Sequence, residues 1–415
     1  MFSNANLNSF LKLGYFLNYK NPTYSFDFSN VNKLKYKDYT EEELIKIGSV
    51  IWMKAVTNRF NNKRNHVVPI SGGLDSRAIL AGLLECTEAK NISTYTFGTP
   101  GTLDYDIGNY VAEKMGTMHM KFSLTEYEYN VDELIDISSK VDHQTVLFHH
   151  PPVQQIESMF GKSLYWSGFM GGELAGSHLE QRIFEEVREA KSNFVSRNTY
   201  VKKINISNST DSEIYHLIED PNYATENLAL EEQLDFQNRQ LKFIAPHVLM
   251  QGFNYIIPFL DQEWMDFILS VERKYRYNQY LYKKILSRTF PKAFSYKTKS
   301  HYGLPLSAGE FRVFMQRAKD KVQNIVSLKN SMSKRRNLNY IDFNYGIRSR
   351  NDLNKVVYEN IMDLKKRKVV EWIDIDEIWK NHIKYNRDLA KALIILTSLE
   401  IHYKAKEINQ KEELQ

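Results

Sequence analysis

The sequence predicts an α/β fold, in which a doubly wound, mostly parallel sheet is followed by a helical C-terminal region. Short apolar runs at 67–70, 93–98 and 118–122 predict strands, and helical patterns separate them. Strands that alternate with helices favour a parallel sheet. From about residue 180 the pattern is mainly helical. In such a sheet the ligand lies at the carboxyl ends of the strands, where the connecting loops meet.

The chain divides into four predicted segments. Residues 1–40 look rich in strands and turns and are too short for an independent catalytic domain, so we interpret them as a connector. Residues 41–180 form the predicted α/β core, which begins with a helix over 41–59 that has one apolar face and acids at its start. Residues 181–405 form the mainly helical region, and 406–415 are a charged tail that we expect to fray.

Composition excludes several classes of protein. The 415 residues are 42% apolar and 25% charged, which is typical of a globular protein outside membranes. The net charge of +5 is spread along the chain, so we expect no nucleic acid partner, and the polar, basic stretch at 320–350 is interpreted as a solvated surface loop. The single thiol, Cys86, excludes an internal disulfide. No signal segment or apolar run of about 20 residues is present, which predicts a cytoplasmic protein without membrane contact.

The first glycine turn carries the most specific chemical signal. The sequence SGGLDS at 71–76 lies between a buried strand and a helix. A glycine turn there lets the backbone approach a ligand, and the free N–H groups at the helix start suit phosphate. Asp75 among these donors implies a cation such as Mg²⁺ between it and an anion. The alternative is an ordinary connection in which Asp75 is the N-cap of the helix.

This loop carries a resemblance. SGGLDS resembles the pyrophosphate-binding (PP) loop of the N-type ATP pyrophosphatases, and SGGLDSR at 71–77 resembles the synthetase domain of the asparagine synthetase family. The resemblance implies an adenine nucleotide alpha hydrolase-like fold that binds ATP and releases pyrophosphate, leaving an acyl-adenylate. In that family a glutaminase domain with an N-terminal cysteine precedes the synthetase domain. Residue 2 here is Phe2, so we expect a synthetase domain without a glutaminase domain.

A second strand-to-glycine turn, in SLYWSGFMGGELAGSH, is similar to the family's second signature. Ser167 and Gly168 match its ATP-contacting pair, and Glu173 matches the glutamate near its end. Phe169 stands where asparagine synthetases have a glutamate linked to the aspartyl-adenylate, and Gly172 stands where an aspartate helps to hold Mg²⁺. Losing a carboxylate beside phosphates weakens cation binding, although Glu173 is adjacent. The departures weigh against asparagine as the product more than against adenylation.

Three later motifs complete the resemblance. Asn238-Arg239-Gln240 is similar to the family's helix that leads into the substrate region. Pro258–Asp261 matches a motif that begins a helix, and we interpret it as architectural, with the aspartate as N-cap. Tyr296–Leu306 resembles a lysine-rich turn whose lysine neutralises charge as pyrophosphate leaves. Lys299 is the first candidate for that lysine and Lys297 the second, because the spacing of the turn is shifted.

The predicted site residues follow from these motifs. Lys299 and Glu173 are the candidate catalytic residues, and Asp75 and Glu173 are the candidate Mg²⁺ ligands. Phe97 matches a residue that packs on adenine in the family, although its type alone fits a core position equally well. The pair His149-His150 is interpreted as part of a loop and not as a metal site. The predicted ATP-binding residues are Ile70, Ser71, Gly72, Gly73, Leu74, Asp75, Ser76, Phe97, Ser167 and Gly168.

The leading functional hypothesis is an ATP-dependent, AMP-forming amide synthetase. It would adenylate a carboxylate of a small molecule or sugar acid and transfer ammonia or an amine to it. The nitrogen sources that we consider are free ammonia, an amine on the substrate and a separate glutaminase subunit. One alternative is a PP-loop protein that binds nucleotide without turnover. The other is a PP-loop enzyme that modifies tRNA, which the absence of catalytic cysteines and of a basic RNA-binding domain disfavours.

Overall fold

A five-stranded parallel sheet organises the structure, with its strands in the order β3–β2–β1–β4–β5. The computed structural model describes residues 3–328 and 341–413, so part of the basic stretch predicted as a loop, 329–340, lies outside the described residues. The α/β fold with a parallel sheet is confirmed. The strands are β1 (His66–Pro69), β2 (Ile92–Gly98), β3 (Met118–Ser123), β4 (Leu164–Trp166) and β5 (Asn254–Ile256).

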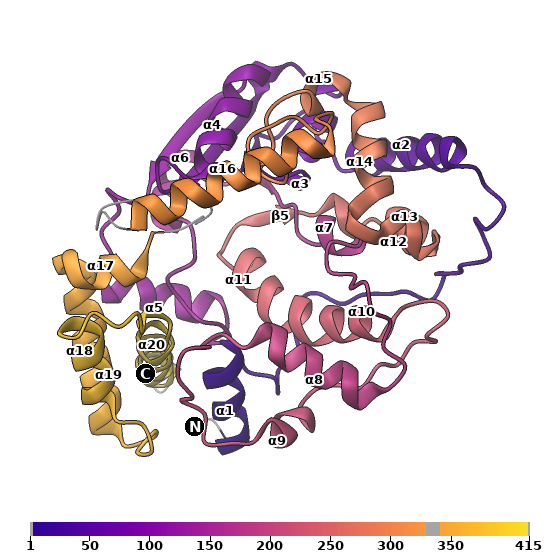
Figure 1. Cartoon of the computed structure of the whole chain (residues 1–415). Helices are drawn as coiled ribbons and strands as arrows, with labels where there is room; N and C mark the ends of the chain where they lie inside the picture. The colour runs from indigo at the N-terminus through magenta and orange to yellow at the C-terminus, as the bar shows by residue number, and fades with distance from the viewer. Residues whose placement is uncertain (1–2, 329–340, 414–415) are drawn as a thin grey trace.

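Helices surround the sheet and make up most of the rest of the chain (Figure 1). The helices before residue 180 are α1 (Asn4–Leu13), α2 (Glu41–Thr57), α3 (Asp75–Leu84), η1 (Ala89–Asn91), α4 (Leu103–Met115), α5 (Val131–Lys140), α6 (Val153–Phe160) and α7 (Gly171–Leu174). The later helices, which confirm a helical C-terminal region, are α8 (Val187–Asn198), α9 (Asp211–Tyr215), α10 (Leu230–Asp235), η2 (Phe236–Ile244), α11 (Ala245–Leu249), η3 (Pro258–Leu260), α12 (Gln262–Ser270), α13 (Arg273–Arg276), η4 (Tyr277–Gln279), α14 (Tyr280–Thr289), α15 (Pro291–Phe294), α16 (Glu310–Leu328), α17 (Phe343–Ser349), α18 (Asn351–Arg367), α19 (Ile375–Ile383) and α20 (Ala390–Glu413).

The strand order places a topological switch between β1 and β4. From β1 the chain adds β2 and then β3 on one side, and it later returns to add β4 and β5 on the other. The connections that leave β1 and β4 therefore diverge and leave a crevice at the carboxyl ends of these strands, which is where open α/β sheets bind ligands. Both glycine turns predicted from the sequence start there, one after β1 and one after β4.

The sheet is covered by an apolar core that the sequence pattern explains. Val67 and Val68 of β1 are fully buried, as a parallel strand with two covered faces requires. Helix α2 starts at a capping box formed by Thr40 and Glu43, and it buries Trp52 against Phe259 and against Trp264 of α12. Helix α2 also packs against α14. Figure 1 shows α2, α12 and α14 on one side of the molecule and α17–α20 on the opposite side, where they form a second core.

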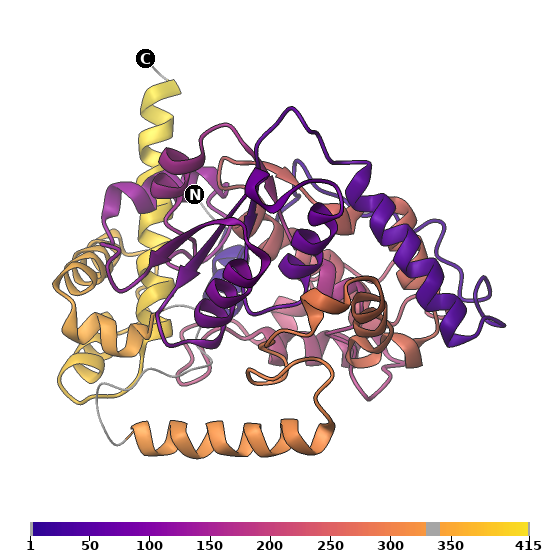
Figure 2. The ribbon, with the colours of Figure 1, turned by 90° about the horizontal axis from the view of Figure 1, so that it is seen from above.

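Two predicted segments are corrected by the structure. Residues 1–40 were expected to be rich in strands and turns, but they contain helix α1, because the apolar side chains at 7, 10 and 11 share one helical face and are buried. The tail was expected to fray from residue 406, but α20 continues to Glu413. No helix-breaking residue interrupts it, and Ala405 is fully buried. Figure 2 shows the end of α20 extending beyond the rest of the molecule.

The predicted loop at 320–350 is also corrected where the structure describes it. The described parts of this stretch are helical, since α16 ends at Leu328 and α17 starts at Phe343. Figure 2 shows α16 along one edge of the molecule. The described residues contain no helix that is long and apolar enough to cross a membrane.

Candidate active site

The loop after β1 is stabilised by hydrogen bonds between its backbone N–H groups and the hydroxyls of its own serines. The N–H of Ser71 donates to the hydroxyl of Ser76 at 3.2 Å, and the N–H of Gly73 donates to the hydroxyl of Ser71 at 3.2 Å. Gly72 has no room for a side chain, because an added Cβ would lie 3.0 Å from the carbonyl oxygen of Leu103. Helix α3 then begins at Asp75, so its first N–H groups, which lack partners within the helix, point toward the loop.

Asp75 is not the N-cap of this helix. Leu74 occupies the N-cap position and makes no capping hydrogen bond with its side chain. The carboxylate of Asp75 instead accepts a hydrogen bond from the hydroxyl of Tyr282 at 2.9 Å and another from the backbone N–H of Gly172. Burial and the nearby charge of Glu173 raise the pKa of Asp75 to about 7. The alternative reading of Asp75 as a capping residue is therefore wrong.

The second glycine turn closes over Asp75. The N–H of Ser167 donates to the carbonyl of Ile256 on β5 at 2.8 Å, which fixes the start of the turn to the sheet. A Cβ at Gly168 would lie 3.0 Å from the Cβ of Asp75, and a Cβ at Gly171 would lie 2.6 Å from its Cγ. Only glycines allow this close approach of the two turns. Phe169, by contrast, is buried in the main core and packs near Phe26 with 6.4 Å between ring centroids.

A cavity of about 300 Å³ lies where the two turns meet. It brings together most of the residues predicted to bind ATP, whereas Gly72, Leu74 and Ser167 support the loops without lining the cavity. Phe97, at the end of β2, lines the cavity although it is also packed against two of the apolar clusters. The lining residues are Pro69, Ile70, Ser71, Gly73, Asp75, Ser76, Phe97, Asp104 and Gly168.

Lys299 lies against the first loop. Its backbone N–H donates to the carbonyl of Gly72 at 2.8 Å, and its Nζ forms an ion pair with Asp104 at 2.5 Å. The Nζ of Lys297 lies 5.1 Å from the ring centroid of Tyr110 instead. The structure thus separates the two candidate lysines, and it brings Lys299 to the edge of the cavity through its ion pair with a lining residue.

The turn that carries Lys299 is tied to helix α3 by Arg77. The Arg77 side chain is fully buried, and its guanidinium donates to the carbonyls of Lys297 at 2.6 Å, Tyr296 at 3.3 Å and Ala293 at 3.4 Å. Burial lowers the pKa of Arg77 to about 10. The arginine of SGGLDSR therefore serves a structural purpose, since it positions the turn next to the loop.

The donors present fit Mg²⁺. Asp75 and Glu173 are close enough for their charges to interact, and the absence of a side chain at Gly172 leaves the Oδ2 of Asp75 approachable, since an added Cβ would lie 3.6 Å from it. Mg²⁺ is commonly bound by one or two carboxylates together with waters and phosphate oxygens. Among residues 3–328 and 341–413, no group of three or more His, Cys, Asp or Glu side chains is arranged to hold a metal ion, and His149-His150 forms none.

The segment that contains the first loop matches a known protein family. Residues 53–149 match the family model described as asparagine synthase. This part of the chain is similar to the asparagine synthase family. The matched segment contains β1, the SGGLDS loop, β2 and β3. The match ends before the second glycine turn and before Lys299. The fold brings both of them next to the matched segment. No curated protein matches the chain.

Three residues near the SGGLDS loop were missed from the sequence. Asp104 lines the cavity and pairs with Lys299, Tyr282 holds Asp75, and the side-chain amide of Gln279 would lie 3.2 Å from a Cβ at Gly172. Asp104 lies in the connection after the predicted strand at 93–98, which ends in a glycine. Its place at the carboxyl end of a strand could have indicated that it lies at the site. Tyr282 and Gln279 lie in a helical region with no motif, so no sequence signal indicated them.

Proposed function

We propose that the protein is an ATP-dependent, AMP-forming amide synthetase. The observation that carries the proposal is the cavity at the switch point of the sheet, where the SGGLDS loop meets the second glycine turn. The proposal also rests on Asp75, which lines this cavity and interacts with the charge of Glu173, and on Lys299, which pairs with the lining residue Asp104.

ATP would lie with its adenine against Phe97 and its phosphates against the loop. Ser71 and Ser76 line the cavity and offer hydroxyls, and the start of α3 adds N–H groups without helical partners and the positive end of a helix dipole. Ser167 and Gly168 would close the phosphate site from the opposite side. These groups are donors, as a triphosphate requires, and the cavity of about 300 Å³ gives the nucleotide room.

Asp75 and Glu173 would hold Mg²⁺, which offsets negative charge on the phosphates when it is bound. Tyr282 orients the carboxylate of Asp75 by its hydrogen bond, and Gly172 supplies a second donor to the same carboxylate. Glu173 takes the role of the aspartate that the family has one position earlier. Without a cation the two carboxylates repel each other, which is consistent with the raised pKa of Asp75.

The reaction would proceed in two steps. A carboxylate oxygen of the substrate attacks the α-phosphorus of ATP, the bond to the β-phosphate breaks and pyrophosphate leaves. An amine or ammonia then attacks the acyl carbon, the bond to AMP breaks and the nitrogen loses a proton. Lys299 would stabilise the charge that builds on the departing pyrophosphate. The substrate class we propose is a carboxylate of a small molecule or sugar acid.

A pyrophosphate-release assay tests the proposal. The full chain is incubated with ATP, Mg²⁺, a panel of carboxylates and ammonium chloride, and AMP and amide are measured together with pyrophosphate. We expect equal amounts of the three products from the wild type and none from Asp75→Ala. Asp38→Ala, which removes an exposed carboxylate far from the loop in sequence, is the matched control. Turnover that requires tRNA would instead support the tRNA-modification alternative.

A second candidate is a nucleotide-binding protein without turnover. It is favoured by one observation, the two missing carboxylates at Phe169 and Gly172, of which the first is replaced by a buried aromatic ring. Calorimetry that detects ATP binding, together with no pyrophosphate from any carboxylate, would support this candidate. Restoring a carboxylate by Gly172→Asp would then be expected to leave the protein inactive.

A further inference from the structure

Helix α16 carries large apolar side chains that face solvent. Phe311, Phe314, Met315 and Val322 are 75%, 66%, 53% and 59% exposed, and these four residues form what we call the apolar stripe. In the part of the chain that the structure describes, Phe311 and Phe314 are the most exposed phenylalanines. Single exposed apolar residues are common, but a contiguous group of them marks a surface that contacts a partner or a membrane.

The helical period gathers these residues on one side of α16. At 3.6 residues per turn the apolar stripe falls within an arc of about 100°, and the exposed Ala318 falls in the same arc. The opposite side is polar. Gln316 is half-buried, Asp320 is buried, and the side-chain amide of Gln316 donates to Asp320 at 3.1 Å. The helix therefore turns its apolar stripe outward, whereas a surface helix of a globular protein normally packs such a stripe on the core.

The position of α16 leaves the apolar stripe accessible. Figure 1 draws α16 in front of the other elements, and Figure 2, turned by 90°, shows it along one edge of the molecule. None of the main contacts between the described helices and strands involves α16. From Phe311 to Val322 the stripe runs for about 16 Å along the helix, so a flat surface can meet all of it at once.

Basic side chains line both edges of the apolar stripe. The same period places Arg312 and Lys319 along one edge and Arg317 and Lys321 along the other, and all four are exposed. They form no ion pair with any carboxylate of the residues that the structure describes. The only exposed acid of this helix is Glu310, at its first residue. The surface thus suits a partner that is apolar in the middle and negatively charged on both sides.

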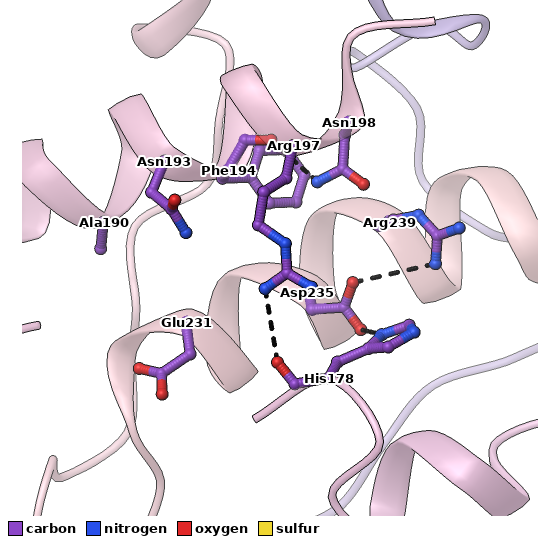
Figure 3. A pocket seen from close by; sticks show the side chains of 9 residues that line it. All are labelled: His178, Ala190, Asn193, Phe194, Arg197, Asn198, Glu231, Asp235 and Arg239. Atoms are coloured by element: carbon purple, nitrogen blue, oxygen red, sulfur yellow. Dashed lines mark hydrogen bonds and ion pairs between the residues drawn. The ribbon is translucent and has the colours of Figure 1, made fainter. Parts of the chain in front are cut away.

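The charges of the polar cavity between α8 and the segment α10–η2, by contrast, pair within the protein (Figure 3). Asp235 lies 3.0 Å from the Nδ1 of His178 and accepts a hydrogen bond from the side-chain amide of Gln240 at 2.9 Å. Arg197 pairs with Glu180 at 2.6 Å. The basic residues beside the apolar stripe have no such neighbours and are therefore available to a partner outside the chain, whereas Arg197 is not.

We propose that α16 lies in the interface of a membrane that contains anionic lipids and holds the protein on the membrane surface. The phenylalanine rings and Met315 would enter the boundary between headgroups and acyl chains, to the depth of about 5–10 Å that such helices reach. The flanking basic side chains would extend to the lipid phosphates, and their aliphatic stems would cover apolar surface.

This mode of binding differs from spanning a membrane. The expectation of no membrane contact came from the absence of an apolar run of about 20 residues, and a helix that lies in the interface needs no such run. A second copy of the chain is a less suitable partner, because pairing two stripes would bring the same basic edges against each other. The inference is independent of the proposed function.

Co-sedimentation of the full chain with lipid vesicles tests the proposal. One set of vesicles is neutral and contains phosphatidylcholine alone, and the other is anionic and contains equal amounts of phosphatidylcholine and phosphatidylglycerol. We expect the protein to bind the anionic vesicles at least tenfold more tightly than the neutral ones. This preference should fall in about 0.5 M NaCl, because salt screens the attraction between the basic side chains and the headgroups.

The apolar stripe is tested by combining Phe311→Ser with Phe314→Ser. We expect this double substitution to weaken binding to anionic vesicles at least tenfold, because the two rings no longer leave water on binding. Leu34→Ser combined with Val50→Ser is the matched control, since these side chains are 73% and 63% exposed but lie outside α16, and it is expected to change nothing. Circular dichroism verifies that all variants fold.

The basic edges are tested by combining Arg317→Gln with Lys321→Gln. We expect about tenfold weaker binding to anionic vesicles and unchanged binding to neutral ones, because only the attraction to the headgroups is lost. Lys37→Gln combined with Lys46→Gln removes two exposed lysines outside α16 and is expected to leave binding unchanged.

Three results would overturn the proposal. They are failure to sediment with anionic vesicles, equal binding to neutral and anionic vesicles, and equal binding by the wild type and the variant that lacks Phe311 and Phe314. Analytical ultracentrifugation distinguishes the alternative partner. A dimer that the same variant dissociates, without vesicle binding, would assign the apolar stripe to a second copy and likewise overturn the proposal. None of these outcomes affects the proposed function, which the pyrophosphate-release assay tests separately.

Discussion

Replacing the ionisable carboxyl group of Asp75 should stabilise the fold, and the gain should be larger at high pH than at low pH. The pKa of Asp75 is about 7 in the fold and 3.8 as its ordinary value. The folded protein therefore binds more protons than the unfolded chain between these values, and its stability falls as the pH rises through this window. At about 1.36 kcal/mol per pKa unit, the penalty reaches about 4 kcal/mol above pH 7 and is below about 2 kcal/mol at pH 5.

Asp75→Asn removes this penalty and keeps the local hydrogen bonds. The amide oxygen can accept from the N–H of Gly172, and the hydroxyl of Tyr282 can rotate to accept from the amide nitrogen. Because Asp75 as a residue is only partly buried, we reduce the range by about half and expect Asp75→Asn to gain about 1–2 kcal/mol more at pH 8 than at pH 5. Urea unfolding at the two pH values measures this difference.

The same urea unfolding experiments supply the control and the result that would contradict the expected pH dependence. Asp38→Asn removes an exposed carboxylate and corrects for the general effect of one negative charge. If Asp75→Asn gives the same change in the free energy of unfolding at pH 5 and pH 8 after this correction, the carboxylate is not destabilised by burial and by Glu173. The argument for a cation between Asp75 and the phosphates would then lose its electrostatic basis.

Three further predictions concern the same site. Lys299→Met should reduce the rate of pyrophosphate formation about 100-fold, since it removes a fixed cation from the leaving group, whereas Lys297→Met should leave the rate unchanged in the same assay. Gly171→Ala should cost about 1–3 kcal/mol in urea unfolding, because its Cβ would lie 2.6 Å from the Cγ of Asp75, whereas Gly309→Ala, which has open space around it, should not. Calorimetry should show that the affinity for Mg²⁺ rises by up to about tenfold per pH unit between pH 5 and 7 and then levels off. The reason is that Asp75 must lose its proton to bind the cation. An affinity that does not change with pH would contradict this prediction.

Much of the core could be predicted because its signals are local. The strand, glycine turn and helix around residues 66–85 follow from short apolar runs and from glycines that no other residue could replace. The strand that precedes the second turn, β4, is also where its apolar run indicates. β5 was missed, because the three residues Asn254–Ile256 become a strand only through their pairing with β4.

The rest of the candidate site depends on contacts between distant segments. Tyr282 reaches Asp75 across 207 positions of the sequence, and Asp104 meets Lys299 across 195. Neither pair has a spacing that a sequence pattern could reveal, because the packing of α14 and of the turn after α15 sets the distance. Helix α1 was missed for another reason, since its apolar positions were interpreted with the period of a strand.

Arg77 has a consequence for how the site can move. Asp75 and Arg77 lie on the same turn of α3, and Arg77 holds the backbone of the segment that carries Lys299. Asp75 and Lys299 are thus held on one rigid unit. Moving the Lys299 turn away from α3 would expose the buried guanidinium of Arg77 and break its hydrogen bonds to three carbonyls. We therefore expect nucleotide exchange to leave this side of the site stationary.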